Sequence, residues 1–195
     1  MIELRSSHLF VGFAILAFIL IFLWKQKRDL WYLFFFAAFG LYLLFVLSGI
    51  IFPIALLSPE HAKLFKPRLN LIPFYFGRCD PMPVLCIGSA IENILLTIPF
   101  GFGISFIARL RSKDFLWLAP LVGLVFEMIQ LILSYVFRSA FRATDINDVI
   151  FNALGVWLGY GVFRIFGWLY LTVTQRFEIK GRHLFAYIYD VVRRP

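Results

Sequence analysis

The residues of this chain best suited to chemistry are five polar side chains: Glu127 and Gln130 interrupt one apolar run, and Asp145, Asp148 and Asn152 lead into the next. A charged side chain in the middle of a bilayer costs roughly 2.5–3.5 kcal/mol even on the lenient insertion scales. Such groups therefore usually face a partner or a water-filled cavity. We predict that these residues form an active or binding site.

Two kinds of chemistry fit these side chains. Glu127 stands in the middle of an apolar run, where a carboxyl group must be protonated, paired or hydrated. In an enzyme Glu127 would act as general acid or base, with Asp148 as the second catalytic residue. In a binding protein the set predicted to contact the ligand is Arg142, Asp145, Gln130, Asn152, Asn93, Arg138 and Glu92. The arginines would engage a phosphate and the carboxylates a cationic group.

Each of these residues also has a structural interpretation. Asp145 and Asp148 could cap the start of a helix, because carboxylates there accept backbone N–H bonds. Asn152 and Gln130 could simply hold two helices together, and Arg142 could pair with lipid phosphate. Oxygen ligands from the two aspartates could hold a divalent cation, but their three-residue spacing is weak support, so we predict no metal site and leave the cofactor open.

The elements that position these residues follow from the composition. Hydrophobic residues make up 62% of the 195-residue chain, and its mean hydropathy is +0.86, which predicts an integral membrane protein of a single domain. The net charge of +8 is better explained by membrane topology than by nucleic acid, because the basic residues stand between and after apolar runs. We expect membrane lipids as partners and no nucleic acid.

Five runs are apolar and close to the length needed to cross a bilayer: 9–24, 30–57, 87–108, 115–137 and 148–172. The predicted fold is therefore all-α, a membrane bundle of five transmembrane helices. The connection between the second and third helices contains the apolar sequence LFKPRLNLIPFYFG, which is predicted to be interfacial or re-entrant. A basic tail, 175–195, follows the last helix.

The distribution of basic residues predicts the orientation. With five spans, eleven of the 19 Lys and Arg residues fall on the side of the C-terminus and seven on the other side. Basic residues in short loops favour the cytoplasm, so the N-terminus is predicted outside and the C-terminus inside. The polar residues then all lie in the outer half of the membrane.

Small and polar residues form a stripe on each of the last two predicted helices. Gly123 and Glu127 belong to one stripe; Asn152, Gly155 and Gly159 belong to the other. Residues three and four apart lie on one helix face, and glycines there let two helices approach closely. We predict that the two stripes face each other.

Four segments in this order resemble the VanZ-like family of small bacterial membrane proteins: NLIPF (70–74), NILLTIPFGFG (93–103), FEMIQ (126–130) and FRATDINDVIFNALGVWLGY (141–160). The resemblance covers residues 70–160 and implies that the family positions are Asn70, Asn93, Pro99, Gly101, Glu127, Gln130, Arg142, Asp145, Asp148, Asn152 and Gly155. Glu92 is not part of this pattern. The family is named for a factor that lowers susceptibility to the lipidated glycopeptide teicoplanin, which implies a role at the bacterial cytoplasmic membrane.

Three functions remain open from the sequence. The leading one is a cell-envelope protein whose outer-leaflet pocket binds an envelope lipid or amphiphile and so lowers susceptibility to lipoglycopeptides. The second is an intramembrane enzyme that modifies a lipid-linked envelope precursor, with Glu127 as acid or base. The third is a lipid transporter or flippase, for which five spans are few and no internal repeat is visible.

Overall fold

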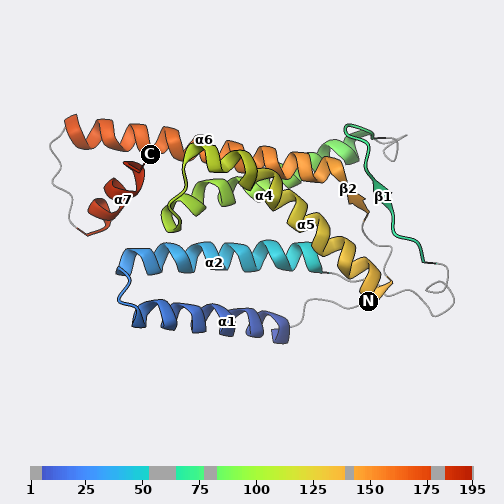
Figure 1. Ribbon diagram of the computed structural model, residues 1–195, viewed down its shortest axis with the longest axis horizontal. Helices are drawn as coiled ribbons and strands as arrows, with labels where there is room; N and C mark the ends of the chain where they lie inside the picture. Colours follow the sequence, from blue (N-terminus) through green and yellow to red (C-terminus); the bar gives the residue numbers. More distant parts are fainter. Residues whose placement is uncertain (1–5, 53–64, 77–82, 139–142, 177–182, 195) are drawn as a thin grey trace.

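The computed structural model describes residues 6–52, 65–76, 83–138, 143–176 and 183–194, and they form a helical bundle (Figure 1). Its helices are α1 (Ser6–Lys25), α2 (Leu30–Ile51), α4 (Pro83–Ile107), the 3-10 turn η1 (Ser112–Asp114), α5 (Phe115–Phe137), α6 (Ile146–Arg176) and α7 (Leu184–Val192). Two short strands, β1 (Leu69–Asn70) and β2 (Thr144–Asp145), pair in parallel.

The prediction of an all-α membrane bundle is confirmed. Helices α2, α4, α5 and α6 are each long and apolar enough to cross a membrane, and α1 is a shorter apolar helix. Many of their large apolar side chains are exposed on the surface of the bundle, as lipid-facing residues are; Phe18, Phe45 and Trp117 are examples.

Several helix ends differ from the predicted bounds. Helix α2 ends at Ile51 rather than at residue 57, because Phe52 turns to an extended conformation before Pro53, where proline disfavours a helical predecessor. Helix α4 begins at Pro83, and α6 continues to Arg176. At 31 residues α6 is about 46 Å long, which exceeds the hydrocarbon thickness of a bilayer.

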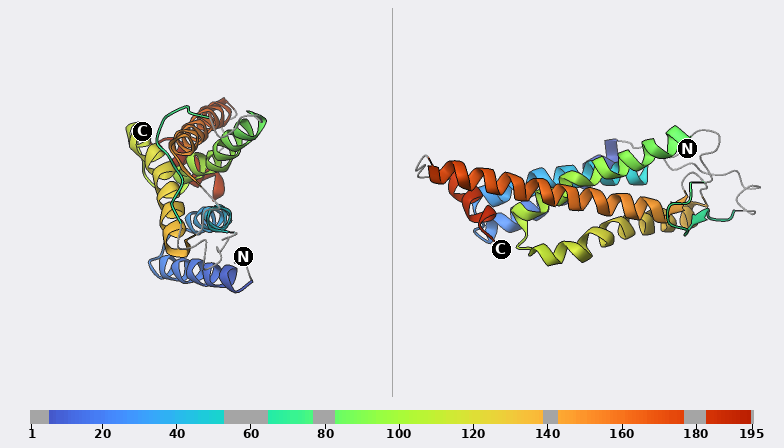
Figure 2. Two further views of the ribbon diagram at one scale, coloured as in Figure 1. Left: turned by 90° about the vertical axis from the view of Figure 1, so that its right-hand side faces the viewer. Right: turned by 90° about the horizontal axis from the view of Figure 1, so that it is seen from above.

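The closest helix pair is α4 with α6, and glycines make the approach (Figures 1 and 2). A Cβ added at Gly155 or Gly159 would clash with the backbone of α4, and one at Gly101 would clash with the backbone of α6. The predicted packing of the α6 glycines against α5 is therefore wrong: they face α4. Gly123 does make the expected contact, because an added Cβ there would lie 2.6 Å from the Val149 carbonyl oxygen of α6.

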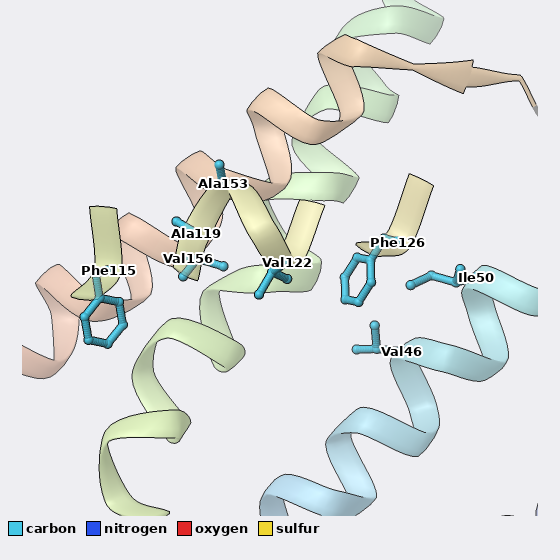
Figure 3. Packing of buried hydrophobic residues seen from close by; sticks show 8 residues of the cluster. All are labelled: Val46, Ile50, Phe115, Ala119, Val122, Phe126, Ala153 and Val156. Atoms are coloured by element: carbon cyan, nitrogen blue, oxygen red, sulfur yellow. The ribbon is translucent and has the colours of Figure 1, made fainter. Parts of the chain in front are cut away.

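The main hydrophobic core lies where α2, α5 and α6 meet (Figure 3). Its eight buried members are Val46, Ile50, Phe115, Ala119, Val122, Phe126, Ala153 and Val156. Helix α5 is inclined across the bundle and so reaches both α6 and α2, while α1 lies at the edge beside α2 (Figures 1 and 2). The core thus fixes α5, which carries Glu127, against the start of α6.

The bundle has two ends of different composition. What we name the basic end holds the turn between α1 and α2, the connection between α4 and α5, the C-terminal half of α6 and α7 (Figure 1). What we name the polar end holds β1, β2 and the first turns of α6 (Figure 1). Helix α7, which the sequence analysis did not predict within the basic tail, packs against α2, α4 and α6.

Candidate functional site

The polar end is organised by the two-residue parallel pairing of β1 with β2. Leu69 lies opposite Thr144 and Asn70 opposite Asp145, and the Thr144 N–H donates to the Arg68 carbonyl at 2.9 Å. This pairing joins the extended segment 65–76 to the start of α6. Residues 75 positions apart in the chain are thereby placed side by side.

Asn70 connects this segment to α6 through its side chain. Its Nδ2 donates to Asp145 Oδ1 at 2.9 Å and to the Tyr75 carbonyl at 3.1 Å, while its Oδ1 accepts from the Ile72 N–H at 3.3 Å. Asn70 is buried. A buried amide with all these partners fixes the turn at 70–75 in one conformation.

Asn147 makes a second connection from α6 to the same turn. Its Nδ2 donates to the Tyr75 carbonyl at 3.1 Å, and its Oδ1 accepts from the Phe74 N–H at 2.6 Å. Phe74 has a φ of 59°, in the left-handed region that non-glycine residues rarely adopt. Such a conformation costs of order 1–3 kcal/mol and persists where neighbouring contacts hold it, which the Asn147 side chain does here.

Asp148 is held from the other side by α4. The Asn93 Nδ2 donates to Asp148 Oδ1 at 2.6 Å. One turn further along, the buried Thr97 hydroxyl donates to the Asn152 carbonyl at 2.8 Å. The Asn152 side chain is also buried, and its Oδ1 has no hydrogen-bond partner in the described part of the chain. The polar contacts between α4 and α6 thus continue inward from Asp148.

Glu127 approaches the same residues from α5. Only 2% of its surface is exposed, and its Oε2 accepts a 2.9 Å hydrogen bond from the Asp145 backbone N–H. Asp145 Oδ1 in turn accepts from the Asn147 N–H at 2.9 Å as well as from Asn70. Glu127 therefore holds the backbone on which the aspartate stands.

These contacts surround a hollow of about 190 Å³, which we name the polar hollow. Its lining comprises Asn70, Tyr75, Phe76, Ser89, Ala90, Ala143, Asp145, Asn147, Asp148 and Phe151. The two carboxylates are its only charged lining groups among the residues that the structure describes. The rings of Phe76 and Phe151 are stacked with centroids 6.5 Å apart.

The structure brings together some of the predicted site residues. Asp145 and Asp148 line the polar hollow, and Asn93 and Glu127 hold them in place. Asn152 is buried one helical turn further along α6.

The other predicted residues that the structure describes do not line the hollow. Glu92 is exposed, Gln130 is half-buried on α5, and Arg138 is an exposed residue at the C-terminal cap of α5. Arg142 lies outside the described residues. Its predicted role stays a prediction.

Three lining residues were not predicted as site residues, namely Asn147, Tyr75 and Ser89, and Asn70 was predicted only as a family position. A signal for Asn147 was present, because it stands between the two aspartates in the sequence DIND. Nothing in the periodicity of α4 singles out Ser89, since its place at the hollow depends on how α4 crosses α6.

The chemistry open to this lining is that of a small acidic hollow with amide donors and aromatic rings. Carboxylates beside aromatic faces suit an ammonium group, which both attract. Within the described ranges no three His, Cys, Asp or Glu side chains cluster as a metal site would require.

A bundle of long apolar helices, with a hydrogen-bonded acid and amide site at one end, defines a multi-pass helical membrane protein. The family model described as VanZ/LLP1 matches residues 39–167, which include all of α4 and α5, most of α6 and every lining residue of the polar hollow. The chain therefore belongs to the VanZ/LLP1 family and is a VanZ-like membrane protein. Comparison with curated proteins and with solved structures gives no match.

Proposed function

We propose that the polar hollow binds the amine-bearing head group of an amphiphile in the bacterial cell envelope. The observation that carries the proposal is the pair of carboxylates, Asp145 and Asp148, that line one hollow and are each fixed by an amide from another segment. Preorganised acceptors of this kind lose little entropy when a cation binds. An ammonium ion there would meet two carboxylates and the Phe76 and Phe151 rings.

The wider role follows from the family. We propose that this binding lowers the susceptibility of the cell to lipoglycopeptides such as teicoplanin, either by engaging the antibiotic itself or by engaging the lipid that it meets at the cell surface. The proposal requires the polar end to face the cell exterior in the cytoplasmic membrane. The excess of Lys and Arg on the side of the basic end supports that orientation.

In this proposal Glu127 is a positioning residue. Its carboxyl group is buried against the Asp145 backbone and is absent from the lining of the hollow. A general base must reach the proton that it abstracts directly or through one water molecule. The geometry therefore favours binding over catalysis by Glu127.

The proposal is tested by removing the charge of each aspartate while keeping its shape. In Asp145→Asn and Asp148→Asn the Oδ1 atom can still accept from Asn70 or Asn93, so the architecture is kept and the charge is lost. We expect both variants, at equal expression, to lose protection against teicoplanin and to leave unchanged the response to a glycopeptide without a lipid chain. Measured inhibitory concentrations in an otherwise isogenic host provide the readout.

Glu92→Gln is the matched control, because Glu92 is an exposed acid near the same end and does not line the hollow. It should protect as the parent chain does. Leu71→Cys, at an exposed position of the polar end, should react on intact cells with a thiol reagent that cannot cross membranes, once Cys79 and Cys86 are replaced by serine. Full protection by both aspartate variants, or labelling of Leu71→Cys only after lysis, would contradict the proposal.

A further inference from the structure

A second hollow lies at the basic end, between the C-terminal half of α6, the end of α4 and α7. Its volume is about 200 Å³. Two arginines from different elements line it, Arg164 on α6 and Arg194 just after α7, together with Tyr160, Ser105 and Trp168. We name it the arginine hollow. Among the residues that the structure describes, no acidic side chain belongs to its lining, so the charge contributed by this lining is positive.

The position of Arg164 along α6 places this hollow at the edge of the membrane. Arg164 is 18 residues after Ile146, which is about 27 Å along the helix at a rise of 1.5 Å per residue. The hydrocarbon core is about 30 Å thick. If the start of α6 lies at one interface, Arg164 lies near the other. Trp168, one turn further and exposed, stands where interfacial tryptophans are enriched.

The walls of the hollow suit the parts of a phospholipid. The arginines and the Tyr160 hydroxyl offer hydrogen-bond donors, and Arg164 Nη1 already approaches the Tyr160 oxygen at 3.5 Å. A guanidinium group binds phosphate oxygens through two parallel N–H donors. Phe163, Leu171 and Val192 supply an apolar wall beside these donors. A phosphate can thus be bound at the arginines while an acyl chain lies along the helix surface.

We propose that the arginine hollow is a binding site for the phosphate group of an anionic phospholipid from the leaflet at the basic end. The site is separate from the polar hollow and does not depend on the function proposed for it. The lipid bridges α6 and the segment that follows α7, since Arg164 belongs to α6 and Arg194 lies just after α7. Bound lipid therefore stabilises the docking of α7 on the bundle.

The test is lipid retention by the purified full-length chain, measured by native mass spectrometry. The probe is an equimolar mixture of phosphatidylglycerol and phosphatidylcholine with the same acyl chains. We expect the parent chain to retain phosphatidylglycerol in preference. Arg164→Gln and Arg194→Gln should each lower that preference by about fivefold, the effect of one basic residue at a charged membrane surface.

Arg193→Gln is the matched control. Arg193 is adjacent to Arg194 and equally basic, but it is exposed, lies over the Tyr189 ring at 5.2 Å and does not line the hollow. Arg193→Gln should retain the preference of the parent chain for phosphatidylglycerol. Arg164→Lys, which preserves the charge, should retain most of it. A thermal melt of each variant identifies any loss of fold, and the charge-preserving lysine variant keeps the test decisive if a glutamine variant unfolds.

Three results would overturn the proposal. One is equal retention of the two lipids by the parent chain. Another is a loss of preference in Arg193→Gln as large as that in Arg194→Gln, which would indicate a diffuse surface charge. The third is displacement of the lipid by millimolar inorganic phosphate, which would assign the arginine hollow to a free anion.

Discussion

At the polar end, amides and carboxylates join distant segments through hydrogen bonds, whereas at the basic end stacked aromatic rings join them together with a few hydrogen bonds such as that of Tyr187. Asn70, Asn147 and Asn93 each bridge two elements at the polar end. At the basic end Phe35 stacks on Phe106 with centroids 4.5 Å apart, and Phe115 stacks on Tyr160 at 3.9 Å. Both ends contain a hollow of similar volume, one lined by carboxylates and the other by arginines.

The two hollows are kept open by different kinds of contact. A hydrogen bond is directional, so the polar hollow depends on the exact placement of a few side chains. Stacked rings tolerate small displacements, so the arginine hollow depends on the summed packing of many groups. We therefore expect a single substitution to change the local stability strongly at the polar end and weakly at the basic end.

The largest loss of stability is expected at the close contact between α4 and α6, which glycines make possible and on which both ends of the bundle depend. In Gly159→Ala the added Cβ meets the Ile98 carbonyl, so the helices must separate. Overpacking of this kind costs typically about 1–3 kcal/mol, and here it falls on backbone that cannot rotate away. The thermal unfolding of purified protein in one detergent measures it. Gly161→Ala is the control, since an added Cβ there meets nothing within 4 Å; equal melting of the two variants would refute the close approach.

The next largest loss of stability is expected when Glu127 is replaced, and this loss should be confined to the polar end. Glu127→Leu leaves the partly buried Asp145 N–H without its Glu127 acceptor, which costs up to about 1–3 kcal/mol. Hydrogen exchange should rise at Asp145 and Asn147 and stay unchanged in α7. Glu127→Gln keeps an oxygen acceptor and should exchange nearly as the parent chain does. Faster exchange at both ends in Glu127→Leu would show that the two ends are not independent.

A smaller effect is expected at Tyr187, which docks α7 at the basic end. Its hydroxyl donates to the Phe106 carbonyl at 2.6 Å, and its ring stacks on Phe35 at 5.5 Å. Tyr187→Phe keeps the stack and loses the hydrogen bond, so we expect a loss of about 1 kcal/mol, measured as faster exchange of the α7 amides. Unchanged exchange in α7 would mean that stacking alone holds it.

The pKa of Tyr187 predicts how the docking of α7 depends on pH. Burial raises the pKa of the Tyr187 hydroxyl from 10.0 to about 12. Because the pKa is higher in the folded state, its contribution to stability is complete below pH 10 and is lost between pH 10 and 12. The α7 amides of the parent chain should therefore exchange faster as the pH rises through that window, and Tyr187→Phe should lack this step.

Much of the fold was predictable, and part of the site was. The apolar runs predicted every long helix, because a bilayer demands a run of that length. Asp145, Asp148 and Asn93 were predicted at the site because polar groups in apolar helices need partners, and the structure brings them together. Helix α7 was not predicted, because a nine-residue helix in a charged tail is stabilised by packing and not by its own propensity.

The sequence did not predict which neighbouring helix packs against each helix face. The stripe of Asn152, Gly155 and Gly159 was visible, but the α6 glycines face α4 and not α5. Spacing shows which residues share a face and contains no information on which neighbour covers it. For the same reason Gln130 and Glu92, suitable in type and position, lie outside the polar hollow.

Hydropathy is a property of one segment at a time, so the sequence alone established an all-α membrane protein and the positions of its apolar helices. Three facts are visible in the folded structure alone. Asn70 and Asn147 complete the polar hollow, and Glu127 accepts a hydrogen bond from a backbone amide. Two arginines line a second hollow. Those facts depend on contacts between segments up to 81 residues apart, which form only when the helices have packed.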